Sequence, residues 1–133
     1  MKTDVLSLET SGREIVDVTG RVSEFVASEG DGLLNVFAPH ATVGLALMET
    51  GSGSESDLED ALDRLLPRDH AYRHSHGSPG HGADHLVPAF VAPSLTVPVV
   101  GGKLQLGTWQ SIVMIDLNRD NPSRKLRLSF VGD

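Results

Sequence analysis

Alternation between apolar and polar side chains is the most frequent pattern along this chain. In the last segment, residues 124–131, Leu126, Leu128 and Phe130 share one face, and the residues between them are charged or polar. Side chains of a β-strand point alternately to opposite faces, so this spacing predicts a strand with one buried face. Alternation or short apolar runs predict further strands over residues 5–10, 13–18, 33–38, 43–48, 95–100, 103–106 and 109–117, with tight turns at Ser11–Gly12 and Gly101–Gly102.

Helical spacing of apolar residues is clearest between residues 56 and 67. Ser56 and Glu59 fit a capping box, apolar residues follow at helical spacing, and Pro67 ends the pattern. The acidic residues near the start match the positive end of a helix dipole, so we interpret them as solvated surface and not as catalytic groups. Weaker signals predict a helix over 19–30, capped by Thr19 and stopped by Gly30, and a short helix over 84–90, capped by Asp84.

Together these elements predict the fold class. Successive strands joined by short turns favour antiparallel pairing, and two or three helices are enough to cover part of a sheet. A length of 133 residues is typical of one domain with its own core. We therefore expect a single α+β domain over residues 1–133, with a largely antiparallel sheet partly covered by helices.

Composition narrows the functional classes. A formal net charge of −7 argues against a nucleic-acid-binding domain, which would usually present a basic face. No apolar run reaches the roughly 18 residues of a membrane span, and the first residues lack the apolar segment of a signal peptide. We therefore expect a cytoplasmic protein that does not contact membranes. The chain has no cysteine, so histidine, aspartate or glutamate must hold any metal ion.

Histidines are concentrated in one short tract, residues 70–85. Five of the six histidines of the chain lie there, and His40 is the sixth. Imidazole is the commonest metal ligand in proteins, and it is mostly uncharged at neutral pH. The first hypothesis is a metal site to which His40 also contributes. The alternative is a polar, glycine-rich surface loop whose histidines hydrogen-bond only to water, and composition leaves both open. The tract contains His70, His74, His76, His81 and His85.

The spacing of the histidines within the tract does not indicate which of them would bind a metal ion. His74 and His76 are two apart and would share a face of an extended backbone, whereas His81 and His85 have helical spacing. The surrounding glycines and Pro79 argue against a continuous helix there. His85 is best placed, at the expected start of a helix, and His76 and His81 are the residues we expect to be bystanders.

Two further groups could carry chemistry. Glu49 follows an apolar strand, where it could act as a general base beside a metal-bound water or simply be an exposed strand-end carboxylate. Trp109, between Thr108 and Gln110, could form the wall of a binding pocket or belong to the core of the sheet. Gly101-Gly102-Lys103 lacks the spacing of a phosphate-binding P-loop, and we interpret it as a turn.

Several motifs in order resemble the YjbQ-type family, also named the secondary thiamine-phosphate synthase family. The most specific is Gly101-Gly-Lys-Leu-Gln-Leu-Gly-Thr-Trp-Gln-Ser-Ile, which is similar to the family signature G-(+)-L-x-L-G-T-W-Q-x-I. The resemblance covers residues 5–132. Further matches are Pro39-His40-Ala41-Thr42, Glu49, Tyr72-Arg73-His74, Asp84-His85-Leu86 and Ser94-Leu-Thr-Val-Pro.

The resemblance implies a fold, an assembly and a site. It implies a compact α/β sandwich that forms a homotrimer, with a divalent metal, zinc in the first place and Mg²⁺ as an alternative, on His40, His74 and His85. It also implies a substrate site that includes Thr42, Thr108, Trp109 and Gln110, with Glu49 and Gln110 as catalytic residues. Ala41 and the stretch Gly51–Ser54 depart from the family pattern close to this site, which puts the substrate preference in doubt.

Three functions follow as hypotheses. The family name implies a transferase that moves a pyrimidine-methyl group from its diphosphate to a thiazole phosphate. Imidazole ligands suit zinc better than magnesium, so that activity can be a side activity. The second hypothesis is zinc-assisted hydrolysis of a small phosphorylated metabolite with Glu49 as base, and the third is a non-catalytic trimer that binds a metal or ligand.

Overall fold

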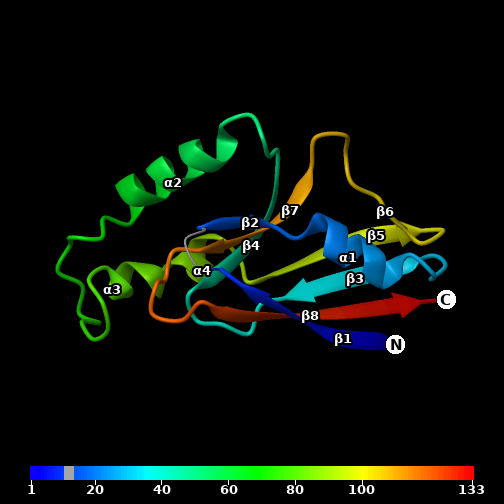
Figure 1. The fold of residues 1–133 in the computed structure, drawn as a ribbon, viewed down its shortest axis with the longest axis horizontal. Helices are drawn as coiled ribbons and strands as arrows, with labels where there is room; N and C mark the ends of the chain where they lie inside the picture. Colours follow the sequence, from blue (N-terminus) through cyan, green and yellow to red (C-terminus); the bar gives the residue numbers. More distant parts are fainter. Residues whose placement is uncertain (11–13) are drawn as a thin grey trace.

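The computed structural model describes residues 1–10 and 14–133. The predicted turn at Ser11–Gly12 and the first residue of the predicted second strand, Arg13, lie outside the described residues. Within these ranges, eight strands form two antiparallel sheets, and four helices lie beside them (Figure 1). The mixed α+β class and the antiparallel pairing predicted from the sequence are confirmed.

The larger sheet has five strands in the order β1-β8-β3-β5-β6. Its long strand β8 pairs with β1 along one edge and with β3 along the other, and buried and exposed side chains alternate along most of its length. The β5–β6 turn is the predicted hairpin, in which Val100 pairs with Lys103. The bounds are β1 Lys2–Glu9, β3 Gly32–Phe37, β5 Ser94–Val100, β6 Lys103–Leu104 and β8 Ser123–Gly132.

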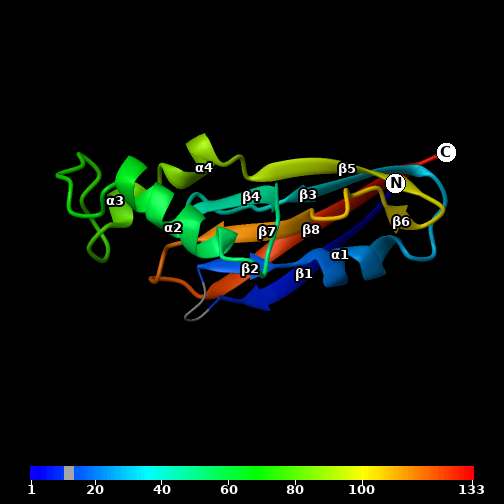
Figure 2. The ribbon, with the colours of Figure 1, turned by 90° about the horizontal axis from the view of Figure 1, so that it is seen from above.

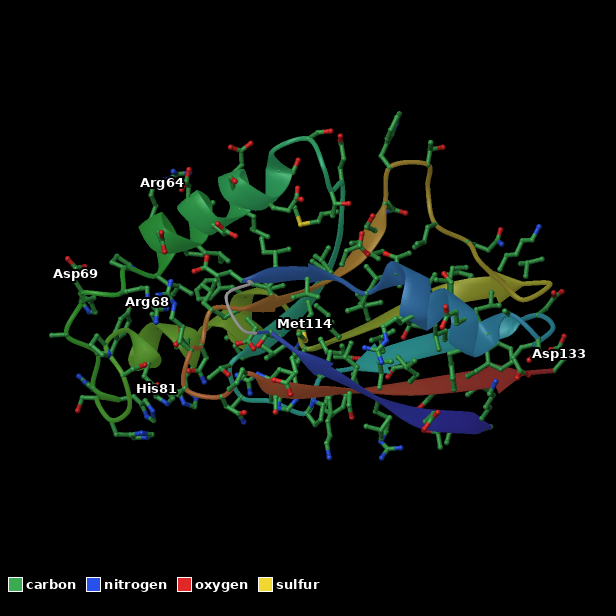
Figure 3. All side chains as sticks on the ribbon, viewed as in Figure 1. Arg64, Arg68, Asp69, His81, Met114 and Asp133 are labelled. Carbon is green, nitrogen blue, oxygen red and sulfur yellow. The ribbon has the colours of Figure 1, made fainter. Side chains whose placement is uncertain are left out.

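The smaller sheet has three strands in the order β2-β7-β4. Its central strand β7 is buried on both faces, since Ile112 and Met114 face the larger sheet while Val113 and Ile115 face the helices. Met114 lies between the layers in Figure 3. Strands buried on both faces read as continuous apolar runs, which is why this segment was recognisable in the sequence. The bounds are β2 Ile15–Asp17, β4 Val43–Met48 and β7 Ser111–Asp116.

The helices cover two parts of this sandwich (Figures 1 and 2). Helix α1 lies beside the main core and buries Val22 and Val26 there. Helices α2, α3 and α4 lie at the outer side of β7, where Leu62, Leu66 and Val87 join a second apolar cluster. The bounds are α1 Thr19–Val26, α2 Ser54–Leu65, α3 His81–Asp84 and α4 Val87–Phe90.

The predicted helix starts are wrong in detail. Helix α2 begins at Ser54, before the predicted capping box, and the Glu55 carboxylate accepts hydrogen bonds from the Gly51 N–H at 3.1 Å. Thr19 is not an N-cap, because its hydroxyl instead accepts a hydrogen bond from the Ile112 N–H at 2.8 Å. The Thr19 side chain has its partner outside the helix, so it is not available to cap α1.

The larger sheet leaves its outer face open. Leu33, Phe37 and Val131 point outward from β3 and β8, and each is at least 40% exposed. Exposed apolar side chains clustered on adjacent strands are unusual for a surface that faces only water. In the described part of the chain, no helix is long and apolar enough to cross a membrane.

Candidate metal centre

Three histidines of the tract converge in the folded chain. His74, His81 and His85 each place one ring nitrogen within 4.8 Å of the others. The Nε2 atoms of His81 and His85 lie 2.9 Å apart. Zinc binds imidazole nitrogens at about 2.0 Å, so the ligand atoms of a tetrahedral site lie about 3.4 Å from one another. The three imidazoles therefore fit a zinc ion after a small adjustment, and three protein ligands leave one position open.

His81 and His85 share a face because a single helical turn forms between them. Helix α3 begins at His81, and the His85 N–H donates to the His81 carbonyl at 3.2 Å. Pro79 and the glycines led us to predict no continuous helix here. That prediction is wrong for residues 81–84, because Pro79 precedes the helix and does not interrupt it. The helical spacing of His81 and His85 therefore brings their rings together.

The short helix α3 is held by a charged pair. Asp84 is fully buried, and its carboxylate accepts hydrogen bonds from both terminal nitrogens of Arg68. The Arg68 guanidinium also donates to the Pro79 carbonyl at 3.3 Å. Asp84 was predicted to cap a helix over 84–90. That prediction is wrong, because Asp84 is the last residue of α3 and its carboxylate faces Arg68.

His74 reaches the cluster because its backbone lies directly against α3. A Cβ atom on Gly82 would lie 2.6 Å from the His74 carbonyl oxygen and 2.7 Å from Tyr72 Cβ, so a larger residue at this position would separate the two segments. Partial desolvation lowers the pKa of both His74 and His85, and the neighbouring imidazoles lower both pKa values further. Both rings are then neutral at pH 7, which is the form that binds metals.

The two remaining histidines of the tract differ from each other. His76 packs its ring edge-on to His74, with centroids 4.0 Å apart, so it lies beside the cluster although it is exposed. His70 lies outside the three-histidine group and packs against Tyr72 at 4.7 Å. The glycines around His81 do not leave it loose, as the bystander interpretation assumed, since its side chain is only 11% exposed.

His40 lies outside this group in the single chain. Its Nε2 accepts a hydrogen bond from the Lys125 N–H at 2.9 Å. Burial, and then the positive charge of Arg124, lowers the pKa of His40, which keeps that nitrogen free to accept. The ligand role of His40 stays a prediction, and it requires Nε2 to leave the Lys125 amide or the other ring nitrogen to bind the metal.

Two further parts of the predicted site, Glu49 and the Trp109 loop, lie at the opposite end of β7. Glu49 is exposed just after β4, whose last residue, Met48, pairs with Ser111 at the start of β7. Trp109 is 74% exposed on the loop that precedes β7, so it is not in the core. Strand β7 has six residues and spans about 20 Å. Within one chain, Glu49 and Trp109 are therefore far from the histidines, which lie near the other end of β7 (Figure 1).

The loop that carries Trp109 is closed by a side chain. The Gln110 carbonyl oxygen Oε1 accepts a hydrogen bond from the Gly107 N–H at 2.8 Å, and the Gln110 N–H donates to the Gly107 carbonyl at 3.0 Å. Thr108 and Trp109 form the tip of this loop, and both are exposed. Gln110 thus fixes the shape of the loop, while its predicted catalytic role stays a prediction.

Thr42 belongs to a buried polar network and is only 4% exposed. Its hydroxyl accepts a hydrogen bond from Arg124 at 3.1 Å. Arg124 also forms a bidentate ion pair with Asp116, with contacts of 2.6 and 3.2 Å. This network joins β4, β7 and β8 at the end of the sandwich near the histidines, so Thr42 holds the scaffold and is shielded from solvent.

The sequence pattern did not point to two polar residues at this end of the sandwich, Arg124 and Asp120. Arg124 is in phase with Leu126 and Leu128, so the alternation already placed its side chain inward, and only its charge concealed the role. Asp120 was not noticed at all, although its Oδ2 lies 2.9 Å from His81 Nδ1. No spacing signal links Asp120 to the tract, because it follows β7 in a polar turn between strands.

Comparisons with known proteins agree with this architecture. The family model described as "UPF0047 protein YjbQ-like" matches residues 4–133. A UPF0047 protein of Mycobacterium tuberculosis is 66% identical over 98% of each chain, and one of Methanothermobacter thermautotrophicus is 40% identical over 98% of this chain and 92% of its own. The crystal structure of a hypothetical protein from Aeropyrum pernix superposes with a TM-score of 0.89 at 30% identity over the whole of both chains.

Proposed function

The chain belongs to the YjbQ-like UPF0047 family, and we propose that it is a zinc-dependent enzyme that acts on a small molecule. The single observation that carries the proposal is the convergence of His74, His81 and His85 within 4.8 Å. Three imidazoles favour zinc over magnesium, which prefers carboxylate and water oxygens. An open fourth position is the pattern of catalytic zinc sites, where the metal supplies Lewis acidity or a bound water of low pKa.

For the reaction, we propose the transfer that the family resemblance implies, of a pyrimidine-methyl group from its diphosphate to a thiazole phosphate. The leaving pyrophosphate needs positive charge near the developing oxyanion, and the flat rings need a surface on which to stack. The indole of Trp109 is exposed and available for stacking, and the Thr108 hydroxyl lies beside it in the sequence. Hydrolysis of a small phosphorylated metabolite with Glu49 as base is the second candidate, since Glu49 is exposed at the same end of β7.

Both candidates need the two ends of β7 to act on one substrate, and this supports the proposal of a homotrimer. A separation of about 20 Å is too large for a metal and a stacking side chain to contact the same small molecule within one chain. A neighbouring copy can supply the Trp109 loop to the histidines of the first. The open face of the larger sheet, with Leu33, Phe37 and Val131, offers apolar surface for such a contact.

Metal analysis followed by assays tests the proposal. We expect about one zinc ion per chain after purification, and loss of zinc binding in His85→Ala. Thiamine phosphate formation from the two synthetic substrates, measured with added Zn²⁺ or Mg²⁺, identifies the transferase. Phosphatase activity that is lost in Glu49→Gln with zinc retained identifies the hydrolase.

Each result has a defined consequence. Protein that carries no zinc and does not bind added zinc contradicts both enzyme proposals. Bound zinc with no turnover on either substrate class leaves a non-catalytic metal-binding protein. Light scattering in solution reports the assembly directly, and a monomer at micromolar concentration contradicts the trimer.

A further inference from the structure

The two ring nitrogens of His81 face different partners. Nε2 lies 2.9 Å from the Nε2 of His85, inside the three-histidine group. Nδ1 points the other way and is shielded from solvent. Asp120 Oδ2 lies 2.9 Å from Nδ1, a close contact whose angle is not that of a well-formed hydrogen bond. His81 is therefore positioned between the candidate metal and a carboxylate.

Asp120 is itself held in place by the backbone. Its Oδ2 accepts a hydrogen bond from the Ser78 N–H at 3.2 Å, and its own N–H donates to Asn118 Oδ1 at 3.0 Å. Asp120 thus links the histidine tract to the turn after β7.

Gly77 allows this link to form. Its φ angle is +81°, and a Cβ at this position would lie 2.8 Å from His81 Cγ and 3.0 Å from Asp120 Oδ2. Any other residue would push His81 and Asp120 apart, in a backbone conformation that L-residues rarely adopt. The glycine beside the histidines therefore has a packing role at the point where the imidazole meets the carboxylate.

We propose that Asp120 is a positioning residue of the metal centre, which holds the proton of His81 on Nδ1 so that Nε2 is free to bind the metal. A metal-binding histidine commonly donates its other ring N–H to a carboxylate, which fixes the tautomer and the ring orientation. This inference rests on the proposed zinc centre and adds Asp120 to it, a residue that the family resemblance does not name.

Two variants of Asp120 and one control test the inference by zinc affinity. In competition with a coloured chelator, Asp120→Ala should bind zinc about 10 to 100-fold more weakly than the unchanged protein. Asp120→Asn keeps an oxygen that can accept the Nδ1 proton, so it should restore part of that loss. Asp69→Ala is the matched control, because Asp69 is exposed near the same end of the molecule (Figure 3) and should leave the affinity unchanged.

The tautomer of His81 gives a readout that a purely structural role would not change. In ¹⁵N correlation spectra of metal-free protein, His81 should carry its proton on Nδ1, and this preference should be lost in Asp120→Ala. Wild-type zinc affinity in Asp120→Ala overturns the proposal. Equal loss of affinity in Asp120→Ala and Asp120→Asn with an unchanged tautomer also overturns it, since Asp120 would then only tie the loop.

The experiment separates this inference from the function on which it rests. If the unchanged protein binds no zinc, the proposed function fails. The spectra of metal-free protein still decide whether Asp120 sets the tautomer of His81. If zinc binds and Asp120→Ala changes neither the affinity nor the tautomer, the zinc centre stands and the role of Asp120 is refuted.

Discussion

The two ends of strand β7 differ in how their polar groups are held. At the end near Asp116, polar groups have partners from distant parts of the chain: Arg124 binds Thr42, and Asp120 faces His81. At the other end, Trp109 is exposed on a loop closed only by contacts between neighbouring residues, Gly107 and Gln110. One end is a site assembled within the chain, and the other is an exposed loop that we propose acts together with a second copy.

The largest loss of stability is expected at the Asp116 end of β7, which depends on a buried charge pair. Replacing Arg124 with methionine should lower the free energy of unfolding by about 3–5 kcal/mol, because the Asp116 carboxylate is left buried without its partner. Urea denaturation followed by circular dichroism measures this. Arg127→Met is the control on the same strand, because Arg127 is exposed on the opposite face. If the two variants lose equal stability, the network does not hold this end.

Metal binding should depend on His81 and not on His70. We expect His81→Ala to weaken zinc binding by more than about 100-fold, because loss of a ligand exceeds the 10 to 100-fold cost of losing a group behind a ligand. His70→Ala is the control, since its ring packs on Tyr72 outside the three-histidine group. Isothermal titration with zinc measures both.

The same titration on His40→Ala decides between two ligand sets. Unchanged affinity favours the group within one chain, formed by His74, His81 and His85. A loss as large as that of His81→Ala would mean that His40 also reaches the metal, as the family resemblance implies.

A smaller change in stability is expected at the end of β7 that carries the exposed Trp109 loop. Trp109→Ala should change the stability of the single chain by less than about 0.5 kcal/mol and leave zinc content unchanged, since the side chain is 74% exposed. Because Trp109 is the only tryptophan, its fluorescence emission should shift to shorter wavelength as protein concentration rises and copies associate. An emission maximum that does not depend on concentration would argue against burial of this loop between copies.

The smallest change in stability is expected for Glu59 on α2, a residue that belongs to neither end of β7. Desolvation, and then repulsion from Glu14 and the neighbouring acidic residues, raises the pKa of Glu59. An acid whose pKa is higher in the folded state binds its proton more tightly there, so stability falls as pH rises through that interval. Glu59→Gln should therefore raise Tm slightly at pH 7 and have no effect below about pH 4. Asp57→Asn is the exposed control in thermal melts at both pH values.

Part of the site was predictable from local pattern. The histidine tract and the absence of cysteine predicted a metal centre held by imidazoles, with a polar surface loop as the alternative. Which histidines converge was not predictable, because the spacing of residues along one helix or strand gives no information on contacts with other parts of the chain. His81 was set aside because of its glycines, yet one of them, Gly77, is what lets His81 lie against Asp120. Trp109 was expected in the wall of a pocket or in the core, and its exposure on the loop before β7 excludes the core.

By itself, the sequence determined the antiparallel α+β class and the buried face of β8, because side-chain alternation is a property of the backbone that needs no distant partner. Even the inward position of Arg124 followed from its phase with Leu126. Only the tertiary structure decided which imidazoles converge and which groups support them. The convergence depends on Arg68 and Asp120, which lie outside the tract and contact it. The periodicity of a single helix or strand does not encode these contacts.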